Sequence, residues 1–205
     1  MSQKPAWMKP VGRGWDIEAG RTAFENPWLI LREYRCRAPT GHPASYGVVS
    51  FKNFAIAILP LHDNGDVTLV GQHRMPLGDY SWELPEGGGP IGVDPLESAK
   101  RELREEAGLL AADWQEVLRF QLSNSVTDER GFGFIATELS ATETEPDETE
   151  ALQIVRRPFR EALALATSGE MPDAMTVAML LRAYHMAHEG QLPGALAEAM
   201  LSSVR

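Results

Sequence analysis

The chain has 205 residues, of which 43% are hydrophobic and 23% charged, and 29 acidic against 19 basic residues give a net charge of −10. This composition is that of an ordinary globular protein with one core, or with one core and an N-terminal appendage. The negative charge argues against binding to nucleic acid or to an anionic membrane surface. A phosphate ester as ligand would therefore require a divalent metal or a few well-placed arginines.

The cysteine content and the hydropathy of the chain indicate in which cellular compartment the protein is expected. Cys36 is the single cysteine, so no disulfide can form within the chain and a reducing compartment is expected. No run of about 18 apolar residues is present, and the N-terminus lacks the apolar segment of a signal peptide. We therefore expect a soluble, cytoplasmic protein with no membrane or nucleic-acid partner.

The N-terminal part of the chain is expected to form an appendage. Residues 1–27 are rich in glycine, proline and charged side chains and are predicted to be an irregular arm. Residues 28–38 and 46–51 are β-rich and flank a turn-forming segment. The predicted division is an arm with a small antiparallel sheet over 1–48 and a second domain over 49–205.

The next segments predict a sheet. The continuous apolar run at 54–61 is typical of a strand buried on both faces. Asn64-Gly65 tolerates positive φ and suits a hairpin turn into a partner strand at 67–75. A short strand at 81–84 leads to Gly87–Gly89, which are expected to form a loop that lets the main chain approach an anion or a metal.

A helix is strongly signalled after these glycines. Asp94 suits the N-cap, Pro95 the first helical position and Gly108 the C-terminal end. Glu97, three residues after Asp94, would complete a capping box. Apolar residues recur at helical spacing and should pack on the sheet: Leu96, Ala99, Leu103 and Ala107.

The remainder of the chain contains more strands, one acidic loop and terminal helices. Strands are predicted at 114–123, 131–139 and 152–159, the acidic loop at 140–151, and helices at 160–169, 173–190 and 194–203. This order favours a mixed-sheet α/β sandwich over a regular alternation of strands and helices.

Three glutamates share one face of the predicted helix. Glu105 and Glu106 lie three and four residues after Glu102, and neighbouring carboxylates on a helix repel one another. Arg101 stands between Glu97 and Glu105 and can pair with either. A divalent cation would turn the repulsion into binding, and an all-oxygen ligand set suits Mg²⁺ or Mn²⁺. The alternative is a solvated helix face rich in charges.

Residues 87–109 resemble the signature of the Nudix hydrolase family. That signature is a glycine, five residues, a glutamate, seven residues, and then Arg-Glu-aliphatic-x-Glu-Glu-x-Gly-aliphatic. The chain departs from it at Val93, where the family has glutamate. The resemblance implies an α/β/α sandwich with a mixed sheet and an N-terminal β-rich arm. Eight of the nine specified positions match: Gly87, Arg101, Glu102, Leu103, Glu105, Glu106, Gly108 and Leu109.

The resemblance extends to the branch that cleaves ADP-ribose and other nucleoside diphosphate sugars. Residues 26–41 and 67–88 look like that branch, and segments after the signature continue the similarity. This implies hydrolysis of the diphosphate of a small nucleoside diphosphate compound, most simply ADP-ribose to AMP and ribose 5-phosphate. Other nucleotide sugars such as GDP-mannose, or dinucleoside compounds, are the alternatives. The branch forms homodimers in which the arms contribute to the partner's pocket, so a homodimer is expected.

The resemblance also implies a metal-binding set. The side chains of Glu102, Glu105 and Glu106 would bind Mg²⁺ or Mn²⁺, together with the main-chain carbonyl of Glu86. Arg101 would hold these glutamates in place.

Other residues would act on the water and on the substrate. The base that activates the water would be Glu150 or Glu148 in the acidic loop, and both remain candidates. Arg74 would meet the diphosphate, unless it is an ordinary surface arginine. Trp28 would either stack on a purine or anchor the arm. The substrate-binding candidates are Arg74, Glu83, Glu129, Trp28, Gly87 and Gly88.

Val93 leaves three interpretations open. The enzyme is active with fewer metals, or a neighbouring carboxylate, Asp94 or Glu97, substitutes for the missing one. In the third interpretation, the chain is a non-catalytic module that binds a nucleotide sugar without cleaving it.

Overall fold

The computed structural model describes residues 4–145, 147–149 and 151–202. The chain divides into two compact units. The first comprises Met1–Lys52 with Ser123–Asp128, and the second comprises Asn53–Leu122 with Glu129–Arg205. The first unit therefore takes a short segment from the middle of the chain, which no local pattern in the sequence indicates.

The first unit is a three-stranded antiparallel sheet in the order β1-β2-β3. Its strands are β1 (Asp16–Glu25), β2 (Leu29–Arg37) and β3 (Pro43–Phe51), preceded by the 3₁₀ turn η1 (Ala6–Met8). The prediction of an irregular arm over 1–27 is therefore wrong for Asp16–Glu25. Every residue of β1 is exposed, so the strand carries no alternation of buried and exposed side chains that a pattern could detect.

Residues 123–128 join this sheet by main-chain hydrogen bonds. The Val49 N–H donates to the Val126 carbonyl at 2.9 Å, and the Asp128 N–H donates to the Val49 carbonyl at 3.4 Å. The Tyr46 hydroxyl also donates to the carbonyl of Ser125. The segment therefore extends the edge of the sheet next to β3.

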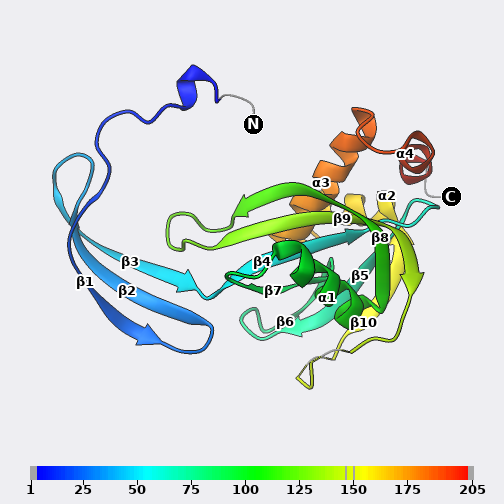
Figure 1. Ribbon diagram of the computed structural model, residues 1–205, viewed down its shortest axis with the longest axis horizontal. Coiled ribbons are helices and arrows are strands. Elements are labelled where there is room, and N and C mark those ends of the chain that lie inside the picture. Colours follow the sequence, from blue (N-terminus) through cyan, green and yellow to red (C-terminus); the bar gives the residue numbers. More distant parts are fainter. Residues whose placement is uncertain (1–3, 146, 150, 203–205) are drawn as a thin grey trace. The chain divides into compact units, whose positions relative to one another are not determined.

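The second unit contains two sheets and four helices. A mixed sheet has the order β7-β4-β9-β8, in which β4 is parallel to β9, and a second sheet has the order β10-β5-β6. Helix α1 lies on one face of the mixed sheet and α3 on the other (Figure 1). This confirms the predicted α/β/α sandwich with a mixed sheet. The strands are β4 (Asn53–Pro60), β5 (Asp66–Arg74), β6 (Asp79–Glu83), β7 (Glu86–Pro90), β8 (Leu109–Gln121), β9 (Arg130–Ala141) and β10 (Gln153–Pro158), and the helices are α1 (Pro95–Ala107), α2 (Phe159–Ser168), α3 (Ala174–His188) and α4 (Gly194–Leu201).

The packing of β4 explains why its sequence is apolar at every position from 54 to 60. Ile56 and Ile58 pack in the cluster that contains α1, whereas Ala57 and Leu59 pack in the cluster formed with α2, α3 and α4. All four side chains are fully buried. A strand covered on both faces needs apolar residues at every position, so the alternation typical of a half-exposed strand is absent.

The turn predicted between β4 and β5 is present, but the two strands do not pair with each other as a hairpin. Gly65 has φ of 82°, and its N–H donates to the His62 carbonyl, as a turn requires. A single bridge joins Leu61 to Val67, and β5 then pairs with β6 and β10 instead. The two strands separate because each belongs to a different sheet, which hydrophobicity and turn chemistry alone do not distinguish.

Helix α1 has the predicted ends and the predicted apolar face. Asp94 Oδ1 accepts from the Leu96 N–H at 3.0 Å, and Gly108 closes the helix with φ of 60°. Glu97 Oε1 instead accepts from Lys100 Nζ at 2.8 Å. The predicted stripe Leu96, Ala99, Leu103 and Ala107 packs on the sheet, which confirms that interpretation. No helix in the described part of the chain is long and apolar enough to cross a membrane.

A pH dependence of stability is expected from the β4–β5 turn. Burial, and to a lesser degree the charge of Arg156, lower the pKa of His62 below its ordinary value of 6.5. Well above pH 6.5 the imidazole is neutral in both states. As the pH falls below 6.5, the unfolded chain takes up a proton more readily than the folded chain, so the free energy of unfolding falls. Urea unfolding at pH 5.5 and 7.5 measures this.

The matched variant is His62→Gln, whose amide retains a hydrogen-bonding partner for Thr68, with which His62 Nε2 pairs at 2.8 Å. We expect the variant to lose less stability than the wild type between the two pH values. An identical loss in both proteins would assign the pH dependence to other groups.

Candidate functional site

Four buried glutamates gather where β6, β7 and α1 meet. Glu83 ends β6, Glu86 begins β7, and Glu102 and Glu106 lie on α1; each is less than a tenth exposed. Carboxylates are rarely buried unless they are paired, because removing a charge from water is costly. The described second unit thus concentrates acidic groups at one place, and their partners define the site.

The three glycines before α1 form a strand, not the predicted loop. Gly87–Gly89 belong to β7, which pairs antiparallel with β4. A Cβ built on Gly87 would overlap the carboxylate of Glu102, and one on Gly89 would lie 2.9 Å from Ser98 Oγ. Glycine is required here because α1 packs closely onto β7. This contact places the carboxylate of Glu102 directly against the main chain of Gly87.

Arg101 ties the helix carboxylates together. Its Nη1 donates to Glu105 Oε2 at 2.6 Å, and its Nη2 contacts Glu102 Oε1 at 2.5 Å and the Gly88 carbonyl at 2.8 Å. Burial opposes the charge of the guanidinium, but Glu102 and Glu105 raise the pKa of Arg101 above its ordinary value. Of the two partners that the sequence allowed, Glu105 is the one engaged. Arg101 therefore supplies a positive charge from within the chain, and this charge holds both glutamates beside β7.

Glu106 and Glu86 form the deepest part of the cluster. The Glu86 N–H donates to Glu106 Oε2 at 2.9 Å, and the Thr176 hydroxyl donates to Glu86 Oε1 at 3.1 Å. Burial, followed by the nearby carboxylates Asp173 and Glu83, raises the pKa of the Glu86 carboxyl well above its ordinary value. Sequence reasoning missed Thr176 and Asp173. A threonine three residues after a helix N-cap is an available but weak signal.

Arg74 and Glu83 form an ion pair at the ends of β5 and β6. Arg74 Nη2 lies 2.5 Å from Glu83 Oε1, which also accepts from Gln72 Nε2 at 3.1 Å. Burial opposes the charge of Arg74, but its hydrogen bond and ion pair with Glu83 raise its pKa above the ordinary value. Weaker attraction from Glu86 and Glu106 acts in the same direction. Arg74 is therefore a half-buried cation that is attracted by three glutamates of the cluster, Glu83, Glu86 and Glu106.

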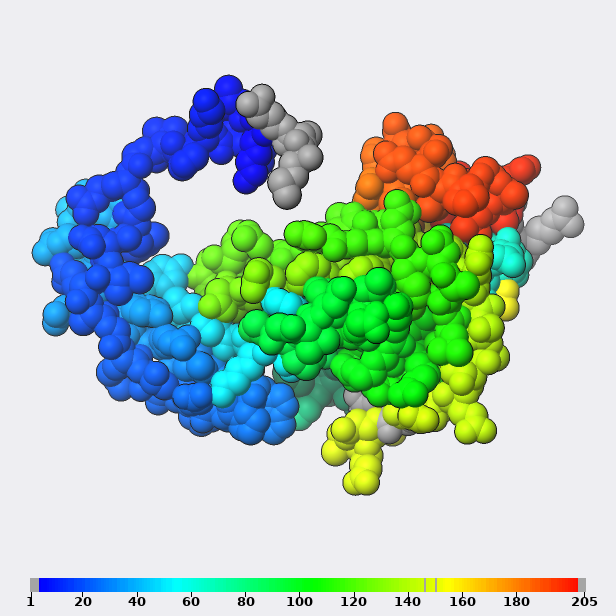
Figure 2. Space-filling model, in the orientation of Figure 1, coloured from blue at the N-terminus to red at the C-terminus, as the bar shows by residue number. Residues whose placement is uncertain are grey.

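The acidic loop is anchored to α1. The Glu145 N–H donates to the Glu105 carbonyl at 3.1 Å, and Glu145 Oε2 lies 3.1 Å from Arg104 Nη2. Glu148 follows in an exposed turn, three residues after this anchor. In the space-filling view, α1 (green) and the acidic loop (yellow-green) lie on the same face (Figure 2). Glu150 lies outside the described residues.

Two other candidates are Glu129 and Trp28. Glu129 is half-buried in the segment just before β9. Trp28 belongs to the first unit and is 65% exposed. Its N–H donates to Asn26 Oδ1, and its carbonyl accepts from the Lys52 N–H, so its main chain is fixed while its ring is free to contact a ligand or a partner.

Val93 lies in the turn before α1. Its side chain is 45% exposed, and its N–H donates to the Pro90 carbonyl. The two neighbouring carboxylates proposed as substitutes are engaged elsewhere, since Asp94 caps the helix and Glu97 pairs with Lys100. The geometry therefore favours a site that operates without a carboxylate at position 93.

The chemistry of this cluster fits a hard divalent cation. Carboxylate oxygens from one helical turn stand beside the main chain of a glycine strand, and Gly87 leaves the space in which Glu102 lies. Among the described residues, no three acidic, histidine or cysteine side chains already stand together as a complete metal-binding group. Arg101 accounts for part of this, because it engages both Glu102 and Glu105. A bound cation would have to share these two carboxylates with Arg101.

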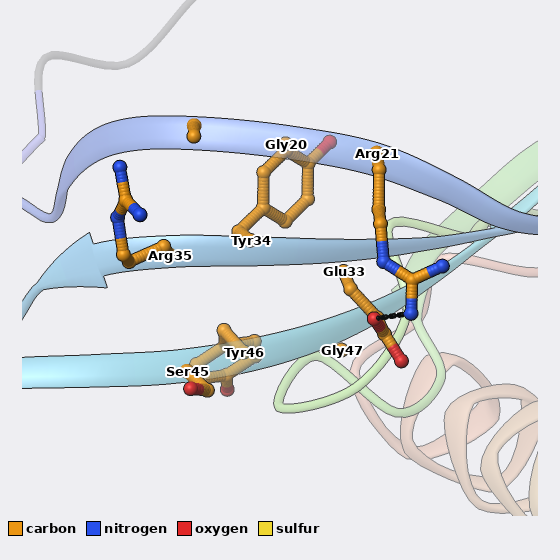
Figure 3. Close-up of a pocket in the computed structure, with 9 residues that line it drawn as sticks. Gly20, Arg21, Glu33, Tyr34, Arg35, Ser45, Tyr46 and Gly47 are labelled. Atoms are coloured by element: carbon orange, nitrogen blue, oxygen red, sulfur yellow. Dashed lines mark ion pairs between the residues drawn. The ribbon is translucent and has the colours of Figure 1, made fainter.

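A cavity of about 580 Å³ lies on the sheet of the first unit. The ring of Tyr34 lies against Gly20, where a Cβ would stand 2.8 Å from the ring, and Arg21 pairs with Glu33 (Figure 3). Of the nine residues that line this cavity, Glu33 is the only acidic one. A single carboxylate is too few ligands for a divalent cation, so the cavity is not a candidate for metal-dependent chemistry.

Comparison with known proteins agrees with the residue pattern. The model of the NUDIX domain matches residues 52–179. The chain is 34% identical over 140 residues to an ADP-ribose pyrophosphatase of Bacillus subtilis, covering 67% of this chain and 75% of that protein. It is 32% identical over 157 residues to an ADP-ribose pyrophosphatase of Mycobacterium tuberculosis, covering 75% of each.

A solved structure of an ADP compounds hydrolase matches the fold with a TM-score of 0.79 and covers 90% of this chain and 100% of its own. Its sequence identity is 20%, so this match bears on the fold alone. The chain therefore belongs to the Nudix family and is a Nudix hydrolase, as residues 87–109 predict, and it resembles the branch whose members cleave ADP-ribose.

Proposed function

We propose that the chain hydrolyses the diphosphate of ADP-ribose to AMP and ribose 5-phosphate in the presence of Mg²⁺ or Mn²⁺. The observation that carries this proposal is the set of glutamates on α1, held against the glycine strand β7 by Arg101. The bound metal would neutralise charge on the diphosphate and lower the pKa of the attacking water. Glu102, Glu105, Glu106 and the main-chain carbonyl of Glu86 would hold it.

The residues of the chain then have distinct tasks. In the reaction, the water oxygen bonds to one phosphorus, the bridging P–O bond breaks, and a proton of the water passes to a carboxylate. Glu148 or Glu150 is the proposed acceptor of that proton, and the anchor at Glu145 supports this because it keeps the acidic loop next to α1. Arg74 is the proposed donor to the diphosphate, which its permanent charge and forked geometry suit.

A substrate panel tests the proposal. ADP-ribose, GDP-mannose and a dinucleoside polyphosphate are incubated with the protein and Mg²⁺, and phosphate release is measured after addition of a phosphatase. We expect turnover of ADP-ribose that chelation of the metal abolishes. Turnover of GDP-mannose alone would contradict the proposed substrate. Tight binding of one compound without turnover would favour the non-catalytic module that Val93 leaves open.

The contribution of position 93 is itself testable. Val93→Glu restores the family glutamate at a half-exposed position with room for the longer side chain. We expect the Mg²⁺ concentration for half-maximal velocity to fall by up to about tenfold, the scale on which groups around a metal tune its affinity. The uncharged control Val93→Gln should leave the Mg²⁺ dependence unchanged. An equal shift in both variants would assign the effect to side-chain size.

We also propose a homodimer formed through the first unit, in a cytoplasmic location. The first unit exposes several large apolar side chains, which support a partner surface: Trp7, Val11, Trp15, Ile17, Phe24 and Trp28. The single cysteine, Cys36, is buried and free, which suits a reducing compartment. Sedimentation equilibrium of the purified chain tests the dimer, and a monomer at micromolar concentration would contradict it.

A further inference from the structure

The Thr176 hydroxyl, on helix α3, connects this helix to the acidic cluster. Its side chain is fully buried. The Leu84 N–H donates to Thr176 Oγ1 at 2.9 Å, and the hydroxyl donates to Glu86 Oε1 at 3.1 Å. One side chain therefore fixes both ends of the three-residue segment that leads from β6 into β7.

The same segment is held from the opposite layer. The Glu86 N–H donates to Glu106 Oε2 on α1 at 2.9 Å, and the Pro85 carbonyl accepts from the Ile58 N–H of β4 at 3.0 Å. Glu86 is thus bound on both sides: its main-chain N–H to Glu106 of α1, and its side-chain carboxylate to Thr176 of α3. A shift of the segment Leu84–Glu86 would have to break the bond from the Leu84 N–H to Thr176 and the bond from the Glu86 N–H to Glu106.

The position of Thr176 is fixed by a hydrogen bond at the start of α3. Asp173 caps this helix, and its Oδ2 accepts from the Thr176 N–H at 2.8 Å. The position of Thr176 is therefore fixed by the helix terminus and not by its side-chain rotamer alone. This distinguishes it from an ordinary polar residue within a buried helix.

We propose that Thr176 is a positioning residue for the metal site, which it serves by holding the main chain of Glu86 in register with the carboxylate of Glu106. The inference rests on the proposed function in one respect, namely that Glu86 and Glu106 bind the metal. Thr176 contacts neither metal nor substrate in this scheme. Its loss should therefore weaken metal binding and, at saturating metal, leave the affinity for the nucleotide unchanged.

Direct Mn²⁺ binding, measured by titration calorimetry without nucleotide, tests this. We expect the dissociation constant of Thr176→Val to rise about tenfold, as is typical when a group that orients metal ligands is removed. Thr176→Ser keeps the hydroxyl and should bind as the wild type does. The matched control is Thr68→Val, because Thr68 is also a buried threonine, 4% exposed, but pairs with His62 at the other end of β5.

Thr68→Val should lose stability without losing Mn²⁺ affinity. Wild-type affinity in folded Thr176→Val, or equal weakening in Thr68→Val, would overturn the proposal. If Thr176→Val does not fold, Glu86→Met removes the acceptor of the same hydroxyl and should raise the dissociation constant to a similar degree. Wild-type affinity in Glu86→Met would then overturn it.

Failure of the proposed function gives a different result. A wild-type protein that binds Mn²⁺ but hydrolyses none of the nucleotides refutes the proposed function, while the variant series still decides the role of Thr176. A wild-type protein that binds no Mn²⁺ overturns the positioning role. If the enzyme is active, Thr176→Val should raise the Mg²⁺ concentration for half-maximal velocity, with an unchanged KM for ADP-ribose at saturating Mg²⁺.

Discussion

Replacing Glu106 with glutamine is expected to lower the turnover of ADP-ribose by about 10²–10³-fold, since a catalytic metal supplies several kcal/mol of transition-state stabilisation. The Glu106 side chain is 3% exposed, and its Oε2 accepts the Glu86 N–H. A glutamine can still accept this bond through its amide oxygen, so the fold should be retained. What the variant loses is the negative charge that a divalent cation requires.

Initial rates at saturating Mg²⁺ and a thermal unfolding curve measure the two effects separately. The control is Glu97→Gln, which removes a carboxylate from the exposed part of the same helix, where it pairs with Lys100. We expect that control to keep nearly full activity. Full activity in Glu106→Gln would exclude Glu106 from the metal site.

Replacing Gly87 with alanine is expected to lower activity by about 10–100-fold, the usual scale for displacing a metal ligand by a neighbouring change. A Cβ at this position would overlap the carboxylate of Glu102. That carboxylate is the end of a flexible side chain, so it can move, but moving it breaks the contact with Arg101. The stability cost should be about 1–3 kcal/mol, as for other overpacked buried positions.

Activity and urea unfolding of Gly87→Ala are compared with those of Gly194→Ala. Gly194 is the first residue of α4, and a Cβ there would meet nothing within 4 Å. The control should have wild-type activity and equal or higher stability, because alanine favours a helix more than glycine does. A Gly87→Ala variant with wild-type activity would show that Glu102 does not need its observed position.

Helix α1 shows what local sequence signals can predict. Its ends depend on Asp94 and Gly108, whose effects are confined to one turn of chain, and its buried face depends on a periodicity within the helix. The clustering of Glu102, Glu105 and Glu106 follows from helical spacing alone. These features were all accessible because every interacting partner lies within about four residues.

Strands β1 and β7 show where this reasoning fails. In β1, every residue is exposed, so its pairing with β2 leaves no trace in hydrophobicity. In β7, a Gly-Gly-Gly sequence normally indicates a flexible turn, but here α1 packs so closely that larger residues would collide with Glu102 and Ser98. Each outcome is decided by a partner that is distant in the sequence.

The residues of the candidate site also fall into two groups, those predictable from local sequence and those that depend on distant partners. The residues of α1 and Arg101 were predictable from spacing and from the family signature. The buried network of Glu86 and Thr176 was not, because its two members are separated by 90 positions and meet only when α3 packs behind the sheet. The family signature predicts a role for the Glu86 carbonyl, whereas the structure also shows a buried side chain with a raised pKa.

The segment 123–128 has a consequence for any shortened form of the protein. A chain that began at Asn53 would keep the whole second unit but would remove β3, the strand to which this segment is hydrogen-bonded. The Val126 carbonyl and the Asp128 N–H would then lose their partners. Main-chain groups left without partners in this way can pair with other chains, so aggregation of the truncated form would reflect the loss of β3 and not a defect in the catalytic core.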